Sequence, residues 1–546
     1  MTRQVKSWKK KSGLVQNKYT YFFFLAGIIV FTIGFRPEFI GFDCRFAVFA
    51  KEMLRNGPTF FPTIYGQPYP DYPGTSTLLI YLISLPFGKV THFTAVLPTA
   101  VVSALILVFI YKIGALHSRK WGSFAVLFAL FTIEFFSYSR SISPDQYVTL
   151  ATVMCFYIVY SATVYHRQKS LWIIPFLFIS GFIFRGPIGL IIPASVVCAY
   201  YLYNRDFANF AFTASAAGVL LIIYTFMLLA AAQFQGGETF VKQVIQAQVT
   251  GRISGNAKHW MGYYFTESFG RYALSYPFAV FIIVVLYKKI FTSKNGEYKL
   301  LASLVIWMMV VLVGMSVPSA RKIRYVLPII PAVALVGSYL FIYPFQNNVL
   351  SGVERTFIGL CSWFPLGVVV FSLAAWMFSE KIESLFGANY LISVILAFLL
   401  AIISWVLNIR LKNDDKKDFA LLIVGTITFI IVMICIIEPV DYYHSSTNPF
   451  ASKIKILQSQ EPGQVVFYKI GADSEAIKFM ANYDMPLKPR FINNPEDMLD
   501  FNFPVYFIAM KGDYETVPKN ITTHIRLLDF GKIGHDECAI FTCRSK

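Results

Sequence analysis

The sequence predicts an all-α polytopic membrane protein that carries a small α/β domain at its C-terminal end. Only 14% of its 546 residues are charged and 56% are hydrophobic, whereas a soluble domain carries roughly 25% charged residues. Apolar runs of the roughly 20 residues that a bilayer requires recur along the chain. From Asp441 onward these runs stop and short, strand-like segments follow. We therefore expect a transmembrane domain at 1–440 and a C-terminal domain at 441–546.

The apolar runs of spanning length number about thirteen, judged against the thickness of a bilayer. Two of them are short, and the break Arg185-Gly186-Pro187 between them is alternatively a kink in one span. The run 76–87 is too short to span, and we expect it to lie in the membrane interface. The expected spans are 18–35, 92–116, 121–139, 145–165, 171–185, 187–203, 209–232, 276–290, 299–317, 325–343, 356–378, 388–409 and 419–438.

The formal net charge of +18 comes from Lys and Arg residues that gather in short loops, notably 288–299 and 410–417. This distribution is the one that the positive-inside rule requires, and it argues against a nucleic-acid-binding protein. The rule places the N-terminus in the cytoplasm and the first loop, 36–91, outside. The basic N-terminal tail resembles a signal peptide, but the apolar run after it is long enough to span, so we expect a retained anchor.

The C-terminal domain is expected to lie on the outer face. Its sequence predicts short strands and helices and contains no nucleotide-binding glycine pattern. The seven cysteines of the chain are scattered without a CxxC pair, which excludes a zinc-finger site and a disulfide framework. The expected strands are 465–470, 504–510, 523–528 and 539–542, and the expected helices are 474–481 and 495–500.

The stretch between the first two spans carries acidic residues close to apolar spans, where a charged side chain is energetically unfavourable. Apolar residues recur at helical spacing over 43–54, which predicts an amphipathic helix lying along the membrane surface. Asp43 opens this helix, Asp71 lies in the loop after it, and Asp145 begins the fourth span. Acids at such positions are candidates for a function. For Asp43 the alternatives are a general base or sugar anchor and a helix N-cap, and for Asp145 the N-cap is the simpler alternative.

Basic residues also lie on the side where positive charge is disfavoured. Arg140, Arg185 and Arg324 stand at the ends of spans or in a short outer loop. An anionic ligand such as a phosphate explains them, and anchoring to lipid headgroups is the alternative. His259 is followed by aromatic residues at the membrane boundary. It is either a metal ligand together with Asp71 or a hydrogen-bonded surface residue.

Taken together and in order, these features resemble the polyprenyl-phosphate-sugar-dependent glycosyltransferases of the GT-C type. Among these, the lipid A aminoarabinose transferases are the more similar group and the protein O-mannosyltransferases are more distant. The resemblance covers the whole membrane part, and the outer C-terminal domain matches as well. Its landmarks are the acid Asp43 after the first span, the Glu52-Met53 helix, the G-x-P-Y-x-[acid]-x-P loop with Asp71, the acid Asp145, the break Arg185-Gly186-Pro187, the His259 loop ending in Tyr263-Tyr264, and RYVLPIIPA at 324–332.

The resemblance implies a GT-C fold and a transferase in the bacterial inner membrane with a periplasmic C-terminal domain. The donor would be a sugar on undecaprenyl phosphate, and the acceptor would be lipid A, another glycan or a protein. Asp43 and Asp145 match the catalytic acids. Arg185, Arg324 and Arg140 would bind the donor phosphate, and Asp71 with His259 matches positions proposed to hold a divalent metal ion.

The chain also departs from the family pattern. Tyr72 stands where a lysine is expected to contact the donor phosphate, so another basic residue must substitute or the donor differs. Cys44 follows the first acid where Glu is frequent, and Gln246 and Gln248 replace an acid-His pair. A protein O-glycosyltransferase and a transporter of lipid-linked substrates remain the alternative functions. A transporter would show acids at mid-span and inverted repeats, whereas these acids lie at span ends on one side.

Overall fold

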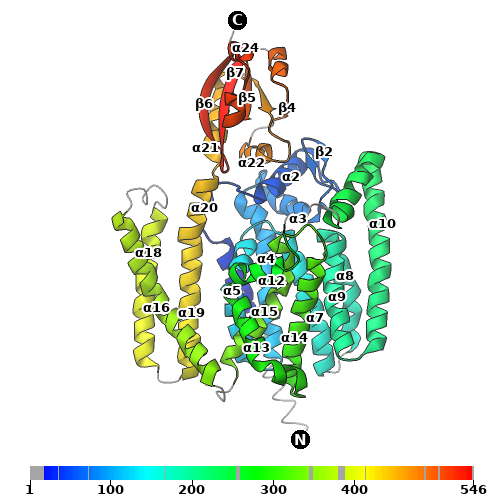
Figure 1. Cartoon of the computed structure of the whole chain (residues 1–546), viewed down its shortest axis with the longest axis vertical. Coiled ribbons are helices and arrows are strands. Elements are labelled where there is room, and N and C mark those ends of the chain that lie inside the picture. The colour runs from blue at the N-terminus through cyan, green and yellow to red at the C-terminus, as the bar shows by residue number, and fades with distance from the viewer. Residues whose placement is uncertain are drawn as a thin grey trace.

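The computed structural model of the chain is a bundle of long apolar helices with a five-stranded sheet standing beyond one end of it (Figure 1). The structure describes residues 18–34, 36–71, 73–165, 168–253, 259–343, 348–378, 388–411, 414–484, 487–501 and 504–543. The basic N-terminal tail, 1–17, and Tyr72 therefore lie outside the described residues. The sheet and the helices below it follow the order that the sequence predicts.

The helices of the membrane part alternate with short connections. Several begin at a proline, whose fixed backbone angle suits a first helical position. The helices are α2 (Asp43–Asn56), α3 (Thr75–Ser84), α4 (His92–Ala115), α5 (Arg119–Leu130), α6 (Ile133–Ser139), α7 (Pro144–Tyr165), α8 (Ile174–Arg185), α9 (Pro187–Tyr203), α10 (Phe207–Ile245), α11 (Gly251–Ile253), α12 (Tyr263–Arg271), α13 (Ser275–Thr292), α14 (Gly296–Ser316), α15 (Ile330–Gly337), α16 (Asn348–Phe378), α18 (Ala388–Arg410), α19 (Asp414–Val432) and α20 (Glu438–Ser445).

Within the described residues, nine helices are long and apolar enough to cross a membrane, and there are ten if α5 and α6, bent by 76°, form one span. Three expected spans form shorter apolar helices, at Lys18–Thr32, Ser170–Arg185 and Pro187–Tyr203. The break that the sequence predicts at Arg185-Gly186-Pro187 is real, because Gly186 adopts a φ of +68° and separates α8 from α9. A left-handed φ of this kind favours glycine.

The centre of the bundle is the segment Ile323–Phe341, whose apolar window is 94% buried, whereas the windows in α10 and α18 are 11% and 17% buried. The buried segment combines a 3-10 helix, Ile323–Ile329, with α15 and packs against α5, α7, α13 and α14. α16, α18 and α19 pack on one another and form a separate group at one side of the bundle (Figure 1). The exposed apolar faces of α10 and α18 match the composition of helices that contact lipid.

Helix α2, the amphipathic helix that the sequence predicts, is more buried than its pattern indicates. It is covered by protein on both sides, because it packs on α3 and on α22 (Glu475–Asn482) of the C-terminal domain. Even its charged residues Lys51 and Glu52 are 9% exposed. Lys51 donates to the carbonyl of Ala481 at 2.6 Å and to Asp484 at 2.8 Å. The helices α3 and α22 together bury both the apolar and the polar face of α2. The amphipathic pattern alone does not predict this burial.

The C-terminal domain contains the expected strands and one more, β4. Its sheet has the order β4-β3-β5-β7-β6, with β4, β3 and β5 parallel and β5, β7 and β6 antiparallel. Because strand residues alternate, Val465 and Phe467 face the core shared with α2, while Val466 and Tyr468 face a second core. The elements are α21 (Asn448–Gln460), β3 (Gln464–Tyr468), β4 (Arg490–Ile492), β5 (Val505–Met510), α23 (Lys511–Glu515), α24 (Lys519–Thr522), β6 (Ile525–Ile533) and β7 (Asp536–Cys543).

A short segment before α2 ties the two parts of the chain together. The carboxylate of Glu38 accepts hydrogen bonds from the Ser446 hydroxyl at 2.6 Å and from the backbone N–H groups of Thr447 and Asn448, both at 2.8 Å. It thereby satisfies free N–H groups at the start of α21. The amide of Asn482 pairs with both backbone groups of Phe39. The segment that leads to Asp43 is therefore held by the C-terminal domain.

We predict that Gly181→Ala lowers the melting temperature of the purified protein. A Cβ on Gly181 in α8 would lie 2.0 Å from the carbonyl oxygen of Gly189 in α9, so the two helices would have to separate. Overpacking of this kind costs about 1–3 kcal/mol. The control is Gly218→Ala in α10, where a Cβ meets nothing within 4 Å and the helix propensity of alanine is the higher one. Equal melting temperatures for both variants would refute the close packing of α8 on α9.

Candidate active site

Asp43 is the first residue of α2, but its carboxylate does not cap that helix. The N-cap position is Phe42, without a side-chain cap. One oxygen of Asp43 accepts a hydrogen bond from the backbone N–H of Ile142 at 2.8 Å, in the loop before α7. The residue is buried, and burial raises the pKa of Asp43 to about 7, against the opposing effects of the Ile142 hydrogen bond and the positive charge of Arg36. The N-cap alternative for Asp43 is thus not the one that the structure adopts.

A histidine that the sequence analysis did not single out lies beside Asp43. His92, the first residue of α4, places Nε2 4.0 Å from the second carboxylate oxygen of Asp43. The hydroxyl of Tyr442 lies 3.2 Å from the same Nε2. The ring of Phe39 stacks on the imidazole with a centroid distance of 5.6 Å. Asp43, His92 and Tyr442 thus lie next to one another at the start of α4.

Asp145 forms an ion cluster with two of the predicted basic residues. Its Oδ1 accepts from Nε of Arg185 at 2.8 Å, and its Oδ2 lies 3.5 Å from Nε of Arg324. Arg185 is 1% exposed and Arg324 is 7% exposed, so two cations are held near one anion away from water. The guanidinium of Arg185 lies over the ring of Tyr325 at 5.4 Å. The geometry brings together Asp145, Arg185 and Arg324, which the sequence analysis singled out for separate roles.

Two contacts join Asp43 to this ion cluster. Ile142, whose N–H binds Asp43, stands three residues before Asp145 in the same loop and helix start. Phe42, the neighbour of Asp43, places its ring 3.8 Å from the guanidinium carbon of Arg324. Cation–π contacts at this distance stabilise the arginine where water is excluded. The two acids therefore belong to one site.

Arg140 binds other parts of the protein, whereas the sequence analysis expects it to bind the donor phosphate. Its guanidinium binds both carboxylate oxygens of Glu438 and the carbonyls of Val30 and Ile33 near the end of the first described helix. Arg36 binds the same Glu438 at 3.0 Å and the backbone carbonyl of Arg140. With its donors used in this way, we assign Arg140 to holding the first helix against α20, and not to donor binding.

Asp71 is paired with an arginine. Its Oδ1 accepts from Nη2 of Arg252 at 2.9 Å, and its backbone carbonyl accepts from the side-chain amide of Gln248. Gln248 also reaches the turn between α8 and α9, where its Oε1 lies 3.0 Å from the position that a Cβ of Gly186 would take. The loop that carries Asp71 is thereby held next to Arg185. Buried Nη1 of Arg252 has no hydrogen-bond partner among the described residues.

His259 lies in other surroundings. Its ring stacks on Tyr263 with a centroid distance of 4.1 Å, the side chain is exposed, and its backbone carbonyl accepts from Arg321. The part of the chain that the structure describes contains no group of three or more His, Cys, Asp or Glu side chains that could hold a metal ion. Since Asp71 already neutralises Arg252, these residues do not fit the divalent metal site that the family resemblance implies.

The sequence analysis missed His92, Tyr442 and Arg252. His92 is a histidine at the first position of a span, and Arg252 stands in the loop where Gln248 replaces a family acid, so both had a weak signal. Tyr442 had none, because its contact with His92 joins residues 350 positions apart in the chain. Long-range contacts of this kind follow from the fold and not from local pattern.

Comparisons with known proteins find likenesses in part of the sequence and in the overall fold. Residues 71–229 match the family model of the dolichyl-phosphate-mannose-protein mannosyltransferases. The whole structure is similar to the crystal structure of ArnT from Cupriavidus metallidurans bound to undecaprenyl phosphate, with a TM-score of 0.71 and 12% identity over 96% of this chain and 98% of that chain. The apo structure of the same ArnT gives a TM-score of 0.69, 11% identity and the same coverage.

No curated protein sequence matches the chain. The structural likeness shows that the chain has the GT-C fold of ArnT, with its C-terminal domain included in the match. It confirms the fold class and the resemblance that the sequence predicts. At this level of identity the likeness concerns the fold, so the reaction has to be argued from the site.

We predict that the effect of Asp43→Asn on stability depends on pH. The folded-state pKa of about 7 exceeds the ordinary value of 3.8, so the folded protein binds a proton that the unfolded chain releases. Stability is therefore lost as pH rises from about 4 to 7, by roughly 4 kcal/mol at most. The asparagine variant lacks this loss, and its melting temperature should exceed that of wild type by more at pH 8 than at pH 5. A difference that is the same at both pH values would contradict the raised pKa.

Asp145→Asn should destabilise the protein at neutral pH, because it removes the carboxylate that faces two buried guanidinium groups. Removing one partner of a buried ion pair costs about 3–5 kcal/mol. Asp473→Asn is the matched control, since Asp473 pairs with Arg45 but is 52% exposed and such pairs contribute about 1 kcal/mol or less. Thermal unfolding in detergent measures both. A melting temperature of Asp145→Asn equal to that of the control would rule out the buried ion cluster.

Proposed function

We propose that the chain is a membrane glycosyltransferase that moves a sugar from undecaprenyl phosphate, or a related polyprenyl phosphate, to an acceptor on the outer face of the membrane. The acceptor we favour is lipid A or another envelope glycolipid. The observation that carries the proposal is the single site in which a buried carboxyl of pKa about 7, Asp43, adjoins the cluster of Asp145 with Arg185 and Arg324. This site lies in a chain with the ArnT fold.

The reaction requires a base and a stabilised leaving group. The acceptor oxygen forms a bond to the anomeric carbon of the sugar, and the bond from that carbon to the phosphate oxygen breaks. The hydroxyl proton of the acceptor passes to the Asp43 carboxylate, and the lipid phosphate leaves with the bonding electrons. A base works best when its pKa lies near the working pH, which is the value that burial gives to Asp43.

The basic residues supply the second requirement. Charge grows on the phosphate as the bond breaks, and fixed cations in a site without water stabilise it. Arg185 and Arg324 are held in place by Asp145, so they need not reorganise when the phosphate arrives. The carboxylate of Asp145 neutralises part of their charge. It thereby stabilises the two buried guanidinium groups when no donor is bound. Arg252, close to the loop of Asp71, replaces the lysine that is absent at Tyr72.

The same site fits an outer-face orientation. We infer a multi-pass protein of the bacterial inner membrane with the N-terminus in the cytoplasm, a transmembrane domain at 1–440 and a periplasmic domain at 441–546. The basic loops at 288–299 and 410–417 then lie inside. A periplasmic site has no supply of nucleotide sugars, which supports a lipid-linked donor. Undecaprenyl phosphate is the molecule bound in the ArnT crystal structure.

A protein acceptor is the second candidate. The family model that matches residues 71–229 is named for transferases that act on proteins, and the match includes Asp145 and Arg185. Donor chemistry and the roles of Asp43 and the arginines are unchanged in this case. Only the molecule that presents the hydroxyl to Asp43 differs.

Deleting the gene should remove one sugar from an envelope molecule. We would compare lipid A, surface glycans and envelope proteins by mass spectrometry in the deletion strain, restored with wild type, Asp43→Asn or the Asp473→Asn control. We expect a pentosamine-type or hexose-type mass on lipid A that wild type and the control restore and Asp43→Asn does not. A sugar missing from a protein instead would favour the second candidate. No change in any glycan would refute the transferase.

A further inference from the structure

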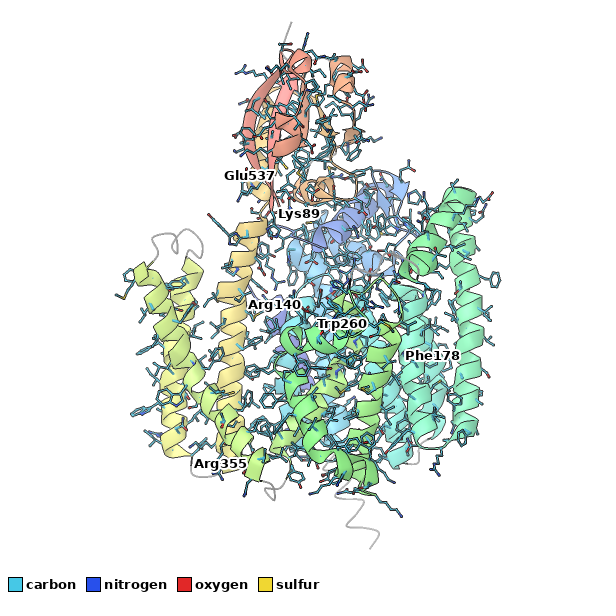
Figure 2. The ribbon with its side chains drawn as sticks, viewed as in Figure 1. Lys89, Arg140, Phe178, Trp260, Arg355 and Glu537 are labelled. Carbon is cyan, nitrogen blue, oxygen red and sulfur yellow. The ribbon has the colours of Figure 1, made fainter. Side chains whose placement is uncertain are left out.

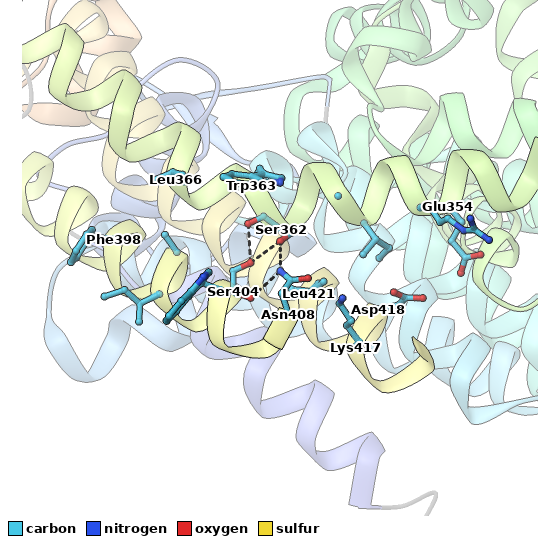
Figure 3. A pocket seen from close by; sticks show the side chains of 16 residues that line it. Glu354, Ser362, Trp363, Leu366, Phe398, Ser404, Asn408, Lys417, Asp418 and Leu421 are labelled. Atoms are coloured by element: carbon cyan, nitrogen blue, oxygen red, sulfur yellow. Dashed lines mark hydrogen bonds between the residues drawn. The ribbon is translucent and has the colours of Figure 1, made fainter. Parts of the chain in front are cut away.

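Buried polar atoms without a partner distinguish the candidate active site from a groove elsewhere in the bundle. That groove lies between α16, α18 and α19, and Figure 2 shows Arg355, on its rim, at the end of the bundle opposite Glu537 in β7. The polar groups in its middle bind one another. Asn408 donates to the Ser362 hydroxyl at 2.7 Å, and the Ser404 hydroxyl donates to the Ser362 carbonyl at 2.8 Å (Figure 3). These groups therefore require no ligand.

Two side chains beside Asp71 each keep one unpaired atom. Oε1 of Gln248 and Nη1 of Arg252 are buried and have no hydrogen-bond partner among the residues that the structure describes. Gln248 is 5% exposed and Arg252 is 8% exposed. Leaving a buried polar atom unpaired is destabilising, and most such atoms in proteins are paired. Two of them side by side in a candidate active site indicate groups that a ligand supplies.

The orientation of the Gln248 amide follows from its neighbours. Its Nε2 donates to the backbone carbonyl of Asp71 and lies 3.4 Å from that of Pro70. Only the nitrogen of an amide can donate to a carbonyl, so Oε1 is the atom that faces away from this loop. There it lies 3.0 Å from the position that a Cβ of Gly186 would take. Because Gly186 directly follows Arg185, the unpaired acceptor adjoins a residue of the proposed phosphate site.

Arg252 adds an unpaired donor beside this acceptor. Its Nη2 donates to Oδ1 of Asp71 at 2.9 Å and its Nε donates to the carbonyl of Ala247, so both N–H groups of Nη1 remain unused. Gln248 and Arg252 stand one turn apart, in the π-helix Gln246–Thr250 and in α11, and both bind Asp71. The side chain of Asp71 is 29% exposed, so this group reaches the edge of the buried region.

A hydroxyl group matches the two unpaired atoms better than an ammonium group does. A hydroxyl both donates and accepts, so it can donate to Oε1 of Gln248 and accept from Nη1 of Arg252. Two neighbouring hydroxyls of one sugar ring can do the same. An ammonium group only donates, so it would leave Nη1 unpaired. It would also lie beside a buried guanidinium whose counter-charge, Asp71, is already engaged.

We propose that Gln248 and Arg252 form the subsite that binds the sugar of the donor, and that this sugar is neutral, without a free amino group. Oε1 of Gln248 accepts from a sugar hydroxyl, and one N–H of Arg252 Nη1 donates to a hydroxyl of the same ring. The other N–H of Nη1 stays available to the donor phosphate. The inference rests on the proposed function, and it adds the class of sugar that the transferase moves.

Binding of three kinds of lipid to the full-length protein tests the subsite. The lipids are undecaprenyl phosphate, the same lipid carrying a neutral sugar (glucose, mannose, galactose or arabinose), and the same lipid carrying aminoarabinose. Each is titrated onto protein in mild detergent, and the rise in melting temperature gives its affinity. We expect wild type to bind one of the neutral-sugar lipids about tenfold more tightly than the other two kinds.

Gln248→Met should lose this preference and still bind undecaprenyl phosphate as wild type does, because it keeps the size of the side chain and removes the acceptor. The matched control is Gln246→Met, an exposed glutamine in the same π-helix, which should keep the preference. A Gln248→Met variant that keeps the preference would overturn the proposal. A variant that also loses undecaprenyl phosphate would overturn it as well, since Gln248 would then only hold the loop of Asp71.

The wild-type result separates the subsite from the proposed function. Binding of undecaprenyl phosphate without preference for any neutral sugar, or with preference for aminoarabinose, would overturn the subsite and leave the transferase standing. A wild type that binds none of the lipids would instead refute the donor site and the proposed function with it.

Discussion

The buried carboxylate of Asp145 is the constraint on which the rest of the site depends. Two arginines, 1% and 7% exposed, could not remain in the bundle without a counter-charge. Asp145 fixes Arg185 at the break between α8 and α9 and Arg324 at the start of the central 3-10 helix. Through Arg324 it also sets the position of Phe42 and hence of Asp43. One anion thus aligns four separate elements of the chain around the proposed phosphate site.

Asp43 and Asp145 illustrate how burial separates the tasks of two similar groups. Asp145 lies between two arginines and orients them. Asp43 is buried, and its loss of hydration outweighs the hydrogen bond from Ile142 and the charge of Arg36, so its pKa rises. The first acid can take up a proton near neutrality, while the second holds two arginines in place. That division is what a transfer between a hydroxyl and a phosphate requires.

Much of this arrangement was visible in the sequence. Length and hydropathy located the spans, and the residues at span ends, Asp43, Asp145, Arg185 and Arg324, were the ones that the fold brings together. The prediction failed where a partner came from far along the chain. Arg140, like Arg185, is a basic residue on the predicted outer side. Its guanidinium group, however, binds Glu438 and backbone carbonyls of the first described helix. The amphipathic pattern of α2 likewise could not tell lipid from a second protein layer, because both bury an apolar face.

The hydrogen bonds between the C-terminal domain and Glu38, Phe39 and Lys51 have a consequence for the order in which parts of the protein fold. These residues are synthesised some four hundred residues before the groups that hold them, which lie between Ser446 and Asp484. Closing a loop of some four hundred residues must wait until both ends exist. The helices can therefore enter the membrane one after another with the segment before Asp43 still unanchored. The position of Asp43 is in this sense set late, in the step that seats the domain at 441–546 against the helices.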